Sequence, residues 1–216
     1  MAALQVAVSI LNADLSAIAD TVQQIAAAGA DSIQIDVMDG HFVSNLALGP
    51  QVCRAVADHT TLPVEAHLMV ERPTQFIQAF AAAGATTVIG HIEVLDDPAA
   101  FAAAVRRLGK RPGFAINPET LASRLIPHLG LADLVVVMGI HPGAGGQTFM
   151  PETLTTLRQL RAARQGQLPA LQLDGGVNQD TVIPIRDAGA DAVIGGSFVF
   201  RHSRGIAAAV AALKRT

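Results

Sequence analysis

Short apolar runs rich in β-branched residues alternate with longer stretches rich in Ala and Leu along the whole chain. The runs have the length of strands, and the stretches that follow them, such as 15–28 and 74–83, place apolar residues at helical spacing. Strands that alternate with helices of this length are typical of βαβ units in a parallel sheet. The predicted strands are 5–10, 31–37, 63–69, 86–91, 113–116, 133–138, 170–173 and 192–194.

The segment Ala-Gly-Ala recurs between a predicted helix and the next strand, at Gly29, Gly84 and Gly189. Glycine adopts the left-handed conformation that ends a helix at little cost, so each segment marks the return from helix to strand. Eight strands with eight helices favour a closed (β/α)8 TIM barrel over an open doubly wound sheet. No G-x-G-x-x-G follows the first strand, and no stretch resembles a linker, so we expect one barrel domain over residues 1–216.

Composition agrees with this fold and narrows the choice of partners. Half of the 216 residues are hydrophobic and 15% are charged, which suits strands buried on both faces. The net charge of −3 and the absence of Trp and Tyr argue against a nucleic-acid partner, and the single Cys53 excludes an internal disulfide and a Cys-based zinc site. Without a signal-peptide pattern or an apolar run of about 18 residues, we expect a cytoplasmic protein with no membrane partner. Its apolar, Ala-rich helices could pack closely against a second copy of the chain or against a neighbouring helix, so a homo-oligomer is possible.

Polar residues stand where the predicted strands end, at the edge of a barrel that carries the reacting groups. They are Ser9, Asp36, His67, His91, Asn117, Asp174 and Ser197. A carboxylate inside an apolar strand, as in "IQIDVMDG" and "LQLDGGV", is costly unless it faces a polar pocket. Asp36 or Asp174 could instead cap a helix or pair with a buried Arg. Two such residues, with His67 on a strand between them, favour a functional site, and His91 is a candidate supporting partner.

The loops predicted after strands six, seven and eight are rich in glycine, with the sequences "HPGAGGQTF", "DGGV" and "GGS". Glycine allows backbone N–H groups to approach a dianion closely, and a phosphate site built from the last loops recurs in barrels. Each loop could be a tight turn and nothing more. Three of them at one rim favour a phosphate-binding site.

Two carboxylates, a histidine and a phosphate anchor together indicate proton transfer on a sugar phosphate. One carboxylate would remove a proton from the carbon beside a carbonyl, and an acid on the other face would return one. The enediolate between these steps needs a positive charge or hydrogen-bond donors near its oxygens. A divalent metal held by Asp and His would meet that need as a Lewis acid.

The segments "SILNADL", "IDVMDGHFVSNLALGP", "EAHLMVERP", "VVVMGIHPGAGGQTF", "LDGGVN" and "GGSFVF" occur in this order over nearly the whole chain. Together they resemble the ribulose-phosphate 3-epimerase family. The resemblance implies that the protein interconverts ribulose 5-phosphate and xylulose 5-phosphate by inverting C3. It also implies that Asp36 and Asp174 act on opposite faces of this small sugar phosphate.

The same resemblance implies further roles around these carboxylates. Asp36, His67 and Asp174 match ligands of one divalent metal, which could be Zn, Fe, Mn, Co or Mg. The residues that match substrate- and phosphate-binding positions are Ser9, His67, Gly143, Ala144, Gly145, Gly146, Gly175, Gly176, Gly196 and Ser197. The residues that match a thioether lining near the reacting carbon are Met38, Met69 and Met138, for which ordinary core packing is the alternative.

The chain departs from the family's pattern at several positions. Gln34 stands where the family usually has a histidine as a fourth metal ligand. The amide oxygen of a glutamine is a poorer ligand for zinc than imidazole, but it suits harder cations. Gln34 could equally serve only as a hydrogen-bonding group. Ala144 replaces a usual aromatic residue. The other unusual residues are Asn12, Ser44, Gly90 and His141. We expect these changes to cluster around the pocket, away from the helices.

Three hypotheses follow from these departures. The first is an epimerase of ribulose 5-phosphate. The second is an epimerase of another ketose phosphate, such as allulose 6-phosphate or a four-carbon ketose phosphate. The third is a catalytically impaired paralogue that binds a sugar phosphate.

Overall fold

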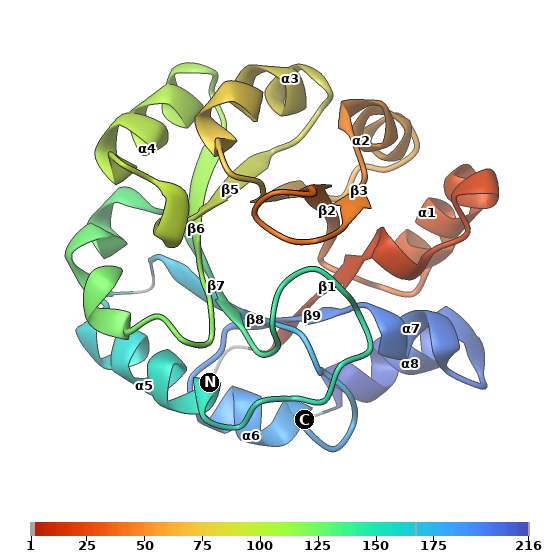
Figure 1. Ribbon diagram of the computed structural model, residues 1–216. Helices are drawn as coiled ribbons and strands as arrows, with labels where there is room; N and C mark the ends of the chain where they lie inside the picture. The colour runs from red at the N-terminus through yellow and green to blue at the C-terminus, as the bar shows by residue number, and fades with distance from the viewer. Residues whose placement is uncertain (1–2, 167, 216) are drawn as a thin grey trace.

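The computed structural model describes residues 3–166 and 168–215, and it has eight parallel strands closed into a barrel (Figure 1). The barrel closes because the first strand pairs with both the second and the last. Its strands are β1 (Gln5–Ser9), β2 (Ser32–Asp39), β4 (Val64–Met69), β5 (Thr87–His91), β6 (Arg111–Ile116), β7 (Leu134–Met138), β8 (Ala170–Asp174) and β9 (Ala192–Gly195). The short β3 (Leu46–Ala47) pairs antiparallel with the end of β2. The predicted TIM barrel is confirmed.

Helices form a ring around the barrel (Figure 1). The α-helices are α1 (Ile18–Ala27), α2 (Pro50–Ala57), α3 (Ile77–Ala82), α4 (Pro98–Arg107), α5 (Thr153–Ala163), α6 (Val182–Asp187), α7 (Ser197–Arg201) and α8 (Gly205–Lys214). The 3₁₀ helices are η1 (Ile10–Asn12), η2 (Leu15–Ala17), η3 (Pro73–Phe76), η4 (Ile92–Val94), η5 (Ala122–Arg124) and η6 (Ile126–Leu131). Among the described residues, no helix is both long and apolar enough to cross a membrane.

The expectation of one α-helix after every strand is wrong between β6 and β7. Only η5 and η6 connect these strands, whereas both α7 and α8 follow β9. Pro127 lacks the N–H that an α-helix would need at that position, and Gly130 lowers helical propensity further. The local sequence therefore favours short 3₁₀ turns over a continuous helix.

Two apolar layers surround the barrel wall. The outer layer lies between strands and helices and includes the fully buried rings of Phe80, Phe101 and Phe114. The Ala-Gly-Ala segments return the chain to this wall with positive φ at their glycines, as predicted. A smaller apolar cluster fills part of the barrel interior; it consists of Ala7, Ile89, Ala115, Leu134, Val136, Met138 and Ile194.

Polar side chains occupy another part of the barrel interior. They come from alternate positions of three strands, and they are Gln34 and Asp36 on β2, Glu65 and His67 on β4, and Gln172 and Asp174 on β8. Parallel pairing sets Gln34 beside Glu65 and Asp36 beside His67. Because side chains alternate between the two faces of a strand, these residues stack in layers toward the C-terminal mouth of the barrel.

Candidate active site

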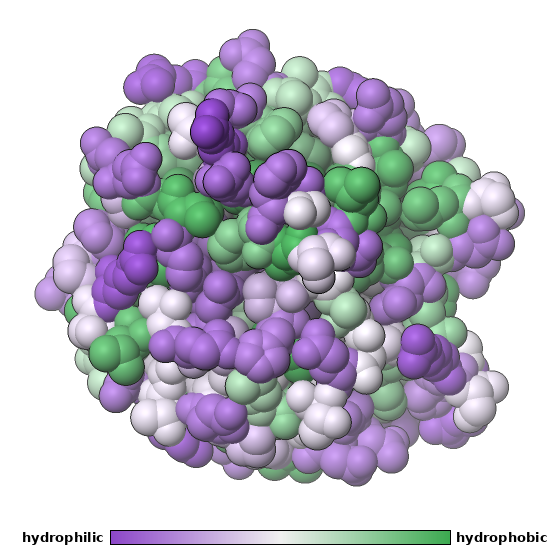
Figure 2. Space-filling view, in the orientation of Figure 1, coloured by the Kyte–Doolittle hydropathy of each residue, from purple (hydrophilic) through white to green (hydrophobic). Residues whose placement is uncertain are grey.

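A pocket opens at the C-terminal mouth of the barrel, where the loops after β2 and β7 lie across the view in Figure 1. Polar side chains spread over this face of the molecule, with smaller apolar areas between them (Figure 2). The pocket is lined by Ser9, Leu11, Asn12, Asp36, Met38, Met69, Met138, Ile140, Pro142, Gly143, Ala144, Gly145, Gly146, Asp174, Gly175, Gly176, Val177, Ile194, Gly196 and Ser197. Most of the predicted site residues are therefore brought together. His67 and Gln34 are fully buried behind this lining.

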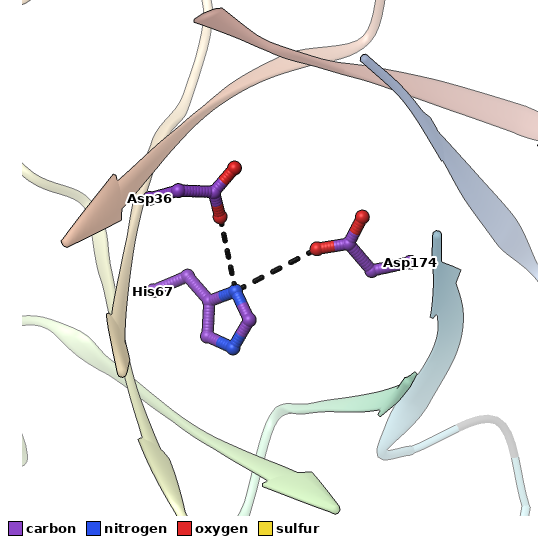
Figure 3. A group of neighbouring side chains, drawn as sticks. All are labelled: Asp36, His67 and Asp174. Atoms are coloured by element: carbon purple, nitrogen blue, oxygen red, sulfur yellow. Dashed lines mark hydrogen bonds and ion pairs between the residues drawn. The ribbon is translucent and has the colours of Figure 1, made fainter. Parts of the chain in front are cut away.

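Asp36, His67 and Asp174 point toward one another from three strands (Figure 3). Nδ1 of His67 lies 3.1 Å from Oδ1 of Asp36 and 3.6 Å from Oδ2 of Asp174. One imidazole nitrogen thus faces both carboxylates. The alternative that either Asp pairs with a buried Arg is wrong, since the described partners are this histidine and neutral side chains.

Gln34 also connects the two carboxylates. Its Nε2 donates to Oδ1 of Asp36 at 2.9 Å and to Oδ2 of Asp174 at 2.8 Å. Its Oε1 is buried and has no hydrogen-bond partner within residues 3–166 and 168–215. The hydroxyl of Ser9 donates to Oδ2 of Asp36 at 2.5 Å, so both oxygens of Asp36 are held by donors. This arrangement fixes the orientation of the Asp36 carboxylate at the pocket floor.

Burial and charge act in opposite directions on His67. Burial by itself would lower the pKa of its imidazole, but hydrogen bonds to Asp174 and Asp36 and their negative charges raise this pKa to about 9. At neutral pH the cation-free site therefore contains an imidazolium between two carboxyl groups. Burial raises the pKa of Asp174, and the charge of Asp36 raises it further against the opposing hydrogen bond of His67. Asp174 is thus suited to carry a proton.

His91 and Glu93 hold the far side of the His67 ring. Nε2 of His67 lies 2.9 Å from Nε2 of His91, whose Nδ1 lies 3.3 Å from Oε2 of Glu93. Burial, with the charge of His67 adding to it, lowers the pKa of His91 to about 4, so this ring is neutral. Its Nδ1–H donates to Glu93, and its Nε2 accepts the Nε2–H of His67. The expected supporting role of His91 thus has a geometric basis, while the role of Glu93 was missed; the spacing His-x-Glu at a strand end was the available signal.

The cluster fits a divalent cation. One ligand atom from each of Asp36, His67 and Asp174 lies within 4.8 Å of the other two. Two carboxylates and an imidazole form a donor set that several divalent metals accept. When His67 is neutral, its Nε2–H remains bonded to His91, so the lone pair of Nδ1 faces the carboxylates. The tautomer that a metal ligand needs is therefore the one that the site supports.

The glycine-rich loops surround another part of the pocket. Gly143, Gly146, Gly175 and Gly176 have positive φ angles, which side chains rarely adopt. A Cβ on Gly176 would come within 2.6 Å of the backbone of Phe149. Glycine is thus required at this close approach of two loops.

The departures from the family's pattern lie in different places. Asn12 and Ala144 line the pocket, as expected. His141 stands outside the lining, exposed, with its Nδ1 2.7 Å from Oε1 of Glu119. The expected clustering is wrong for Gly90, because a Cβ there would lie 3.0 Å from the ring of Phe101, on the side of helix α4. Ser44 is exposed and also outside the lining.

The sequence missed several apolar residues of the pocket wall. They are Leu11, Ile140, Pro142, Val177 and Ile194. Most of them lie next to predicted site residues in the chain. Their closeness to the end of a strand was the signal that could have identified them as pocket residues. Their number shows that the pocket combines an apolar wall with the polar floor formed by the carboxylates.

The fold places the chain among barrel proteins. A crystal structure of 3-hexulose-6-phosphate synthase superimposes with a TM-score of 0.73 at 21% identity, covering 99% of this chain and 98% of that one. Phosphoribosylanthranilate isomerase from Thermotoga maritima superimposes with a TM-score of 0.67 at 14% identity, covering 97% of this chain and 96% of that one. These likenesses support the fold alone.

Sequence comparison identifies the family. Residues 5–200 match the ribulose-phosphate 3 epimerase family. Ribulose-phosphate 3-epimerase 2 of Cupriavidus necator is 41% identical over 92% of this chain and 85% of that protein. Ribulose-phosphate 3-epimerase of Mycobacterium bovis is 39% identical over 97% of this chain and 91% of that protein. The chain belongs to the ribulose-phosphate 3-epimerase family and is an epimerase enzyme.

Proposed function

We propose that the protein inverts C3 of a phosphorylated ketose, above all in the interconversion of D-ribulose 5-phosphate and D-xylulose 5-phosphate. The names of its relatives support this substrate. The observation that carries the chemistry is the pair Asp36 and Asp174, which reach one pocket from β2 and β8 and share Gln34 and His67 as partners. A single domain, a cytoplasmic location and a homo-oligomer stay predictions from sequence.

The two carboxyl groups carry the proton transfer. Ionised Asp36 removes the C3 proton from one face, and the electron pair of the C–H bond passes into the C2 carbonyl to form an enediolate. Asp174, whose pKa is raised by burial, then gives its proton to C3 from the other face as the carbonyl re-forms. The protons on the two carboxyl groups exchange with solvent before the next turnover, and the reverse reaction uses the same groups with their roles exchanged.

Neighbouring residues hold these groups and protect the intermediate. Ser9 orients Asp36 through its hydroxyl, and in the cation-free protein Gln34 orients both carboxylates through hydrogen bonds. A divalent cation held by Asp36, His67 and Asp174 would, when bound, supply positive charge beside the developing enediolate oxygens. The side chains of Met38, Met69 and Met138 line the pocket and would keep water from the reacting carbon.

The glycine-rich loops are the proposed phosphate anchor. Gly143–Gly146, Gly175, Gly176, Gly196 and Ser197 line one pocket together with the carboxylates. Backbone N–H groups in such loops bind an oxyanion without the desolvation of a buried cation. The anchor would place C3 between Asp36 and Asp174.

The test is the pair of variants Asp36→Asn and Asp174→Asn. Each removes a proton-transfer group while keeping its size, so epimerisation of ribulose 5-phosphate and exchange of the C3 proton in D₂O should both fall by roughly 10²–10⁴-fold. Asp187→Asn, at an exposed site on α6, is the matched control and should retain activity. Normal turnover in both site variants would refute the proposal.

A second substrate is favoured by one observation. Asn12 and Ala144, two departures from the family's pattern, lie in the pocket wall. A smaller residue at 144 leaves more space beside the substrate, which could suit allulose 6-phosphate or another ketose phosphate. Ranking kcat/KM across a panel of phosphorylated ketoses separates these substrates. Binding without C3 exchange for every member would instead indicate a sugar-phosphate-binding paralogue.

A further inference from the structure

Two buried oxygen atoms below the carboxylates have no hydrogen-bond partner in the described part of the chain. They are Oε1 of Gln34 and Oε2 of Glu65. Gln34 is fully buried and Glu65 is 5% exposed. The two residues are direct neighbours in the register of β2 and β4, so their side chains lie on the same side of the sheet. The Gln34 oxygen is an acceptor, and a buried acceptor without a donor costs on the order of 1–3 kcal/mol. Burial raises the pKa of the Glu65 carboxyl, which accepts hydrogen bonds and, when protonated, also donates one.

A half-turn of the Gln34 amide would change both contacts. The observed orientation directs Nε2 to Asp36 and Asp174 and leaves Oε1 without a donor. The reversed orientation brings Oε1 to the carboxylates and moves the NH₂ group to the side from which Oε1 came. Glu65 is the neighbour in the strand register that carries an unpaired oxygen. Without a cation, this orientation would place a carbonyl oxygen against two carboxylates, which is unfavourable. A divalent cation among these oxygens removes that repulsion.

We propose that Gln34 is a cation-responsive ligand. In the cation-free protein its amide donates to both carboxylates, and when a divalent cation binds, the amide turns so that Oε1 becomes the fourth ligand. Glu65 then accepts a hydrogen bond from Nε2 and holds the turned amide. This inference rests on the cation site of the proposed function and is independent of which sugar phosphate is the substrate.

The turned amide would change which metal the site prefers. An amide oxygen is a hard ligand, and with two carboxylates it gives the site three oxygen donors and one nitrogen donor. Such a set favours Mn²⁺ and Mg²⁺ relative to Zn²⁺ when compared with a site that has a second imidazole. Gln34→His should therefore shift the ratio of affinities toward Zn²⁺.

Calorimetric titration of chelator-treated protein with Mn²⁺ and with Zn²⁺ tests the ligand role. Gln34→Met keeps the length of the side chain but removes its oxygen, so Mn²⁺ should bind at least about tenfold more weakly. Gln34→His should bind Zn²⁺ more tightly and Mn²⁺ no more tightly than the parent chain. Gln75→Met, outside the barrel interior, is the matched control and should leave both affinities unchanged. An unchanged Mn²⁺ affinity in Gln34→Met would overturn the proposal.

A second measurement uses the unaltered chain and does not depend on how a variant folds. The side-chain NH₂ signals of Gln34 in a ¹H–¹⁵N spectrum should shift on saturation with Mg²⁺ or Zn²⁺, because their hydrogen-bond acceptors change. If the Gln34 NH₂ signals do not shift at saturation, the proposed rotation of the amide is wrong. Failure of the proposed epimerase function would give a different result. No ketose phosphate would exchange its C3 proton, while the affinity for Mn²⁺ would still depend on Gln34.

Discussion

Replacement of His91 by Phe would remove the acceptor that holds the buried face of His67. The ring of His91 already lies 4.6 Å from the ring of Phe42, so a phenyl group of similar size keeps this contact. It loses the bond from Nε2 of His67, at 2.9 Å, and the bond to Glu93. The His67 side chain is fully buried, so water cannot easily replace the lost acceptor.

The expected magnitude follows from the charge of His67. A hydrogen bond to a charged group contributes about 1.5–3 kcal/mol, and one pKa unit corresponds to about 1.4 kcal/mol. Loss of the acceptor destabilises the imidazolium by about this amount. The neutral ring donates the same bond, which contributes about 0.5–1.5 kcal/mol, so only the difference of about 1–1.5 kcal/mol shifts the pKa. The pKa of His67, which is about 9, should therefore fall by about one in His91→Phe. The free energy of unfolding near pH 7 should fall by about 1.5–3 kcal/mol.

NMR titration of the imidazole ¹⁵N signals in chelator-treated protein measures this pKa directly, and urea unfolding measures the stability. His59→Phe is the control, because His59 is exposed and its Nδ1 lies 2.8 Å from the carbonyl oxygen of Ala55, outside the pocket. The control should change neither value for His67. A His67 pKa that stays near 9 in His91→Phe would refute the reasoning that His91 accepts its proton.

Three further predictions concern pH and the loops. The pKa of His67 in the folded protein lies above its ordinary value of 6.5. The contribution of His67 to the stability of the chelator-treated protein is therefore full below pH 6.5 and is lost as pH rises through about 9. Urea unfolding should show this decline in stability, and His67→Asn should flatten it. Cation binding displaces the proton on Nδ1 of His67, so the affinity for the cation, measured by calorimetry, should rise about tenfold per pH unit between 6.5 and 9. An affinity that does not change with pH would contradict this. Gly176→Ala places a Cβ 2.6 Å from Phe149 at a positive φ and should cost about 1–3 kcal/mol and raise KM, whereas Gly29→Ala, at a positive φ with open space, should leave KM unchanged.

Much of the fold could be predicted from the sequence because its signals are local. The alternation of short β-branched runs with helical stretches predicted the barrel, and the strand ends predicted where Asp36, His67 and Asp174 would lie. The same reasoning failed between β6 and β7, where Pro127 interrupts an otherwise apolar helical stretch. It also failed at Gly90, whose choice depends on the ring of Phe101 from another element.

The sequence by itself determined the order of the elements, the two carboxylates and the three glycine-rich loops, since each depends on residues close together in the chain. Only the tertiary structure decided which atoms meet. Gln34 reaches Asp174 across 140 positions because β2 and β8 face each other in a closed barrel. The chain from His67 through His91 to Glu93 likewise requires the register of β4 and β5. Hydrogen bonds depend on distances of a few tenths of an ångström, and strand register and barrel closure set these distances.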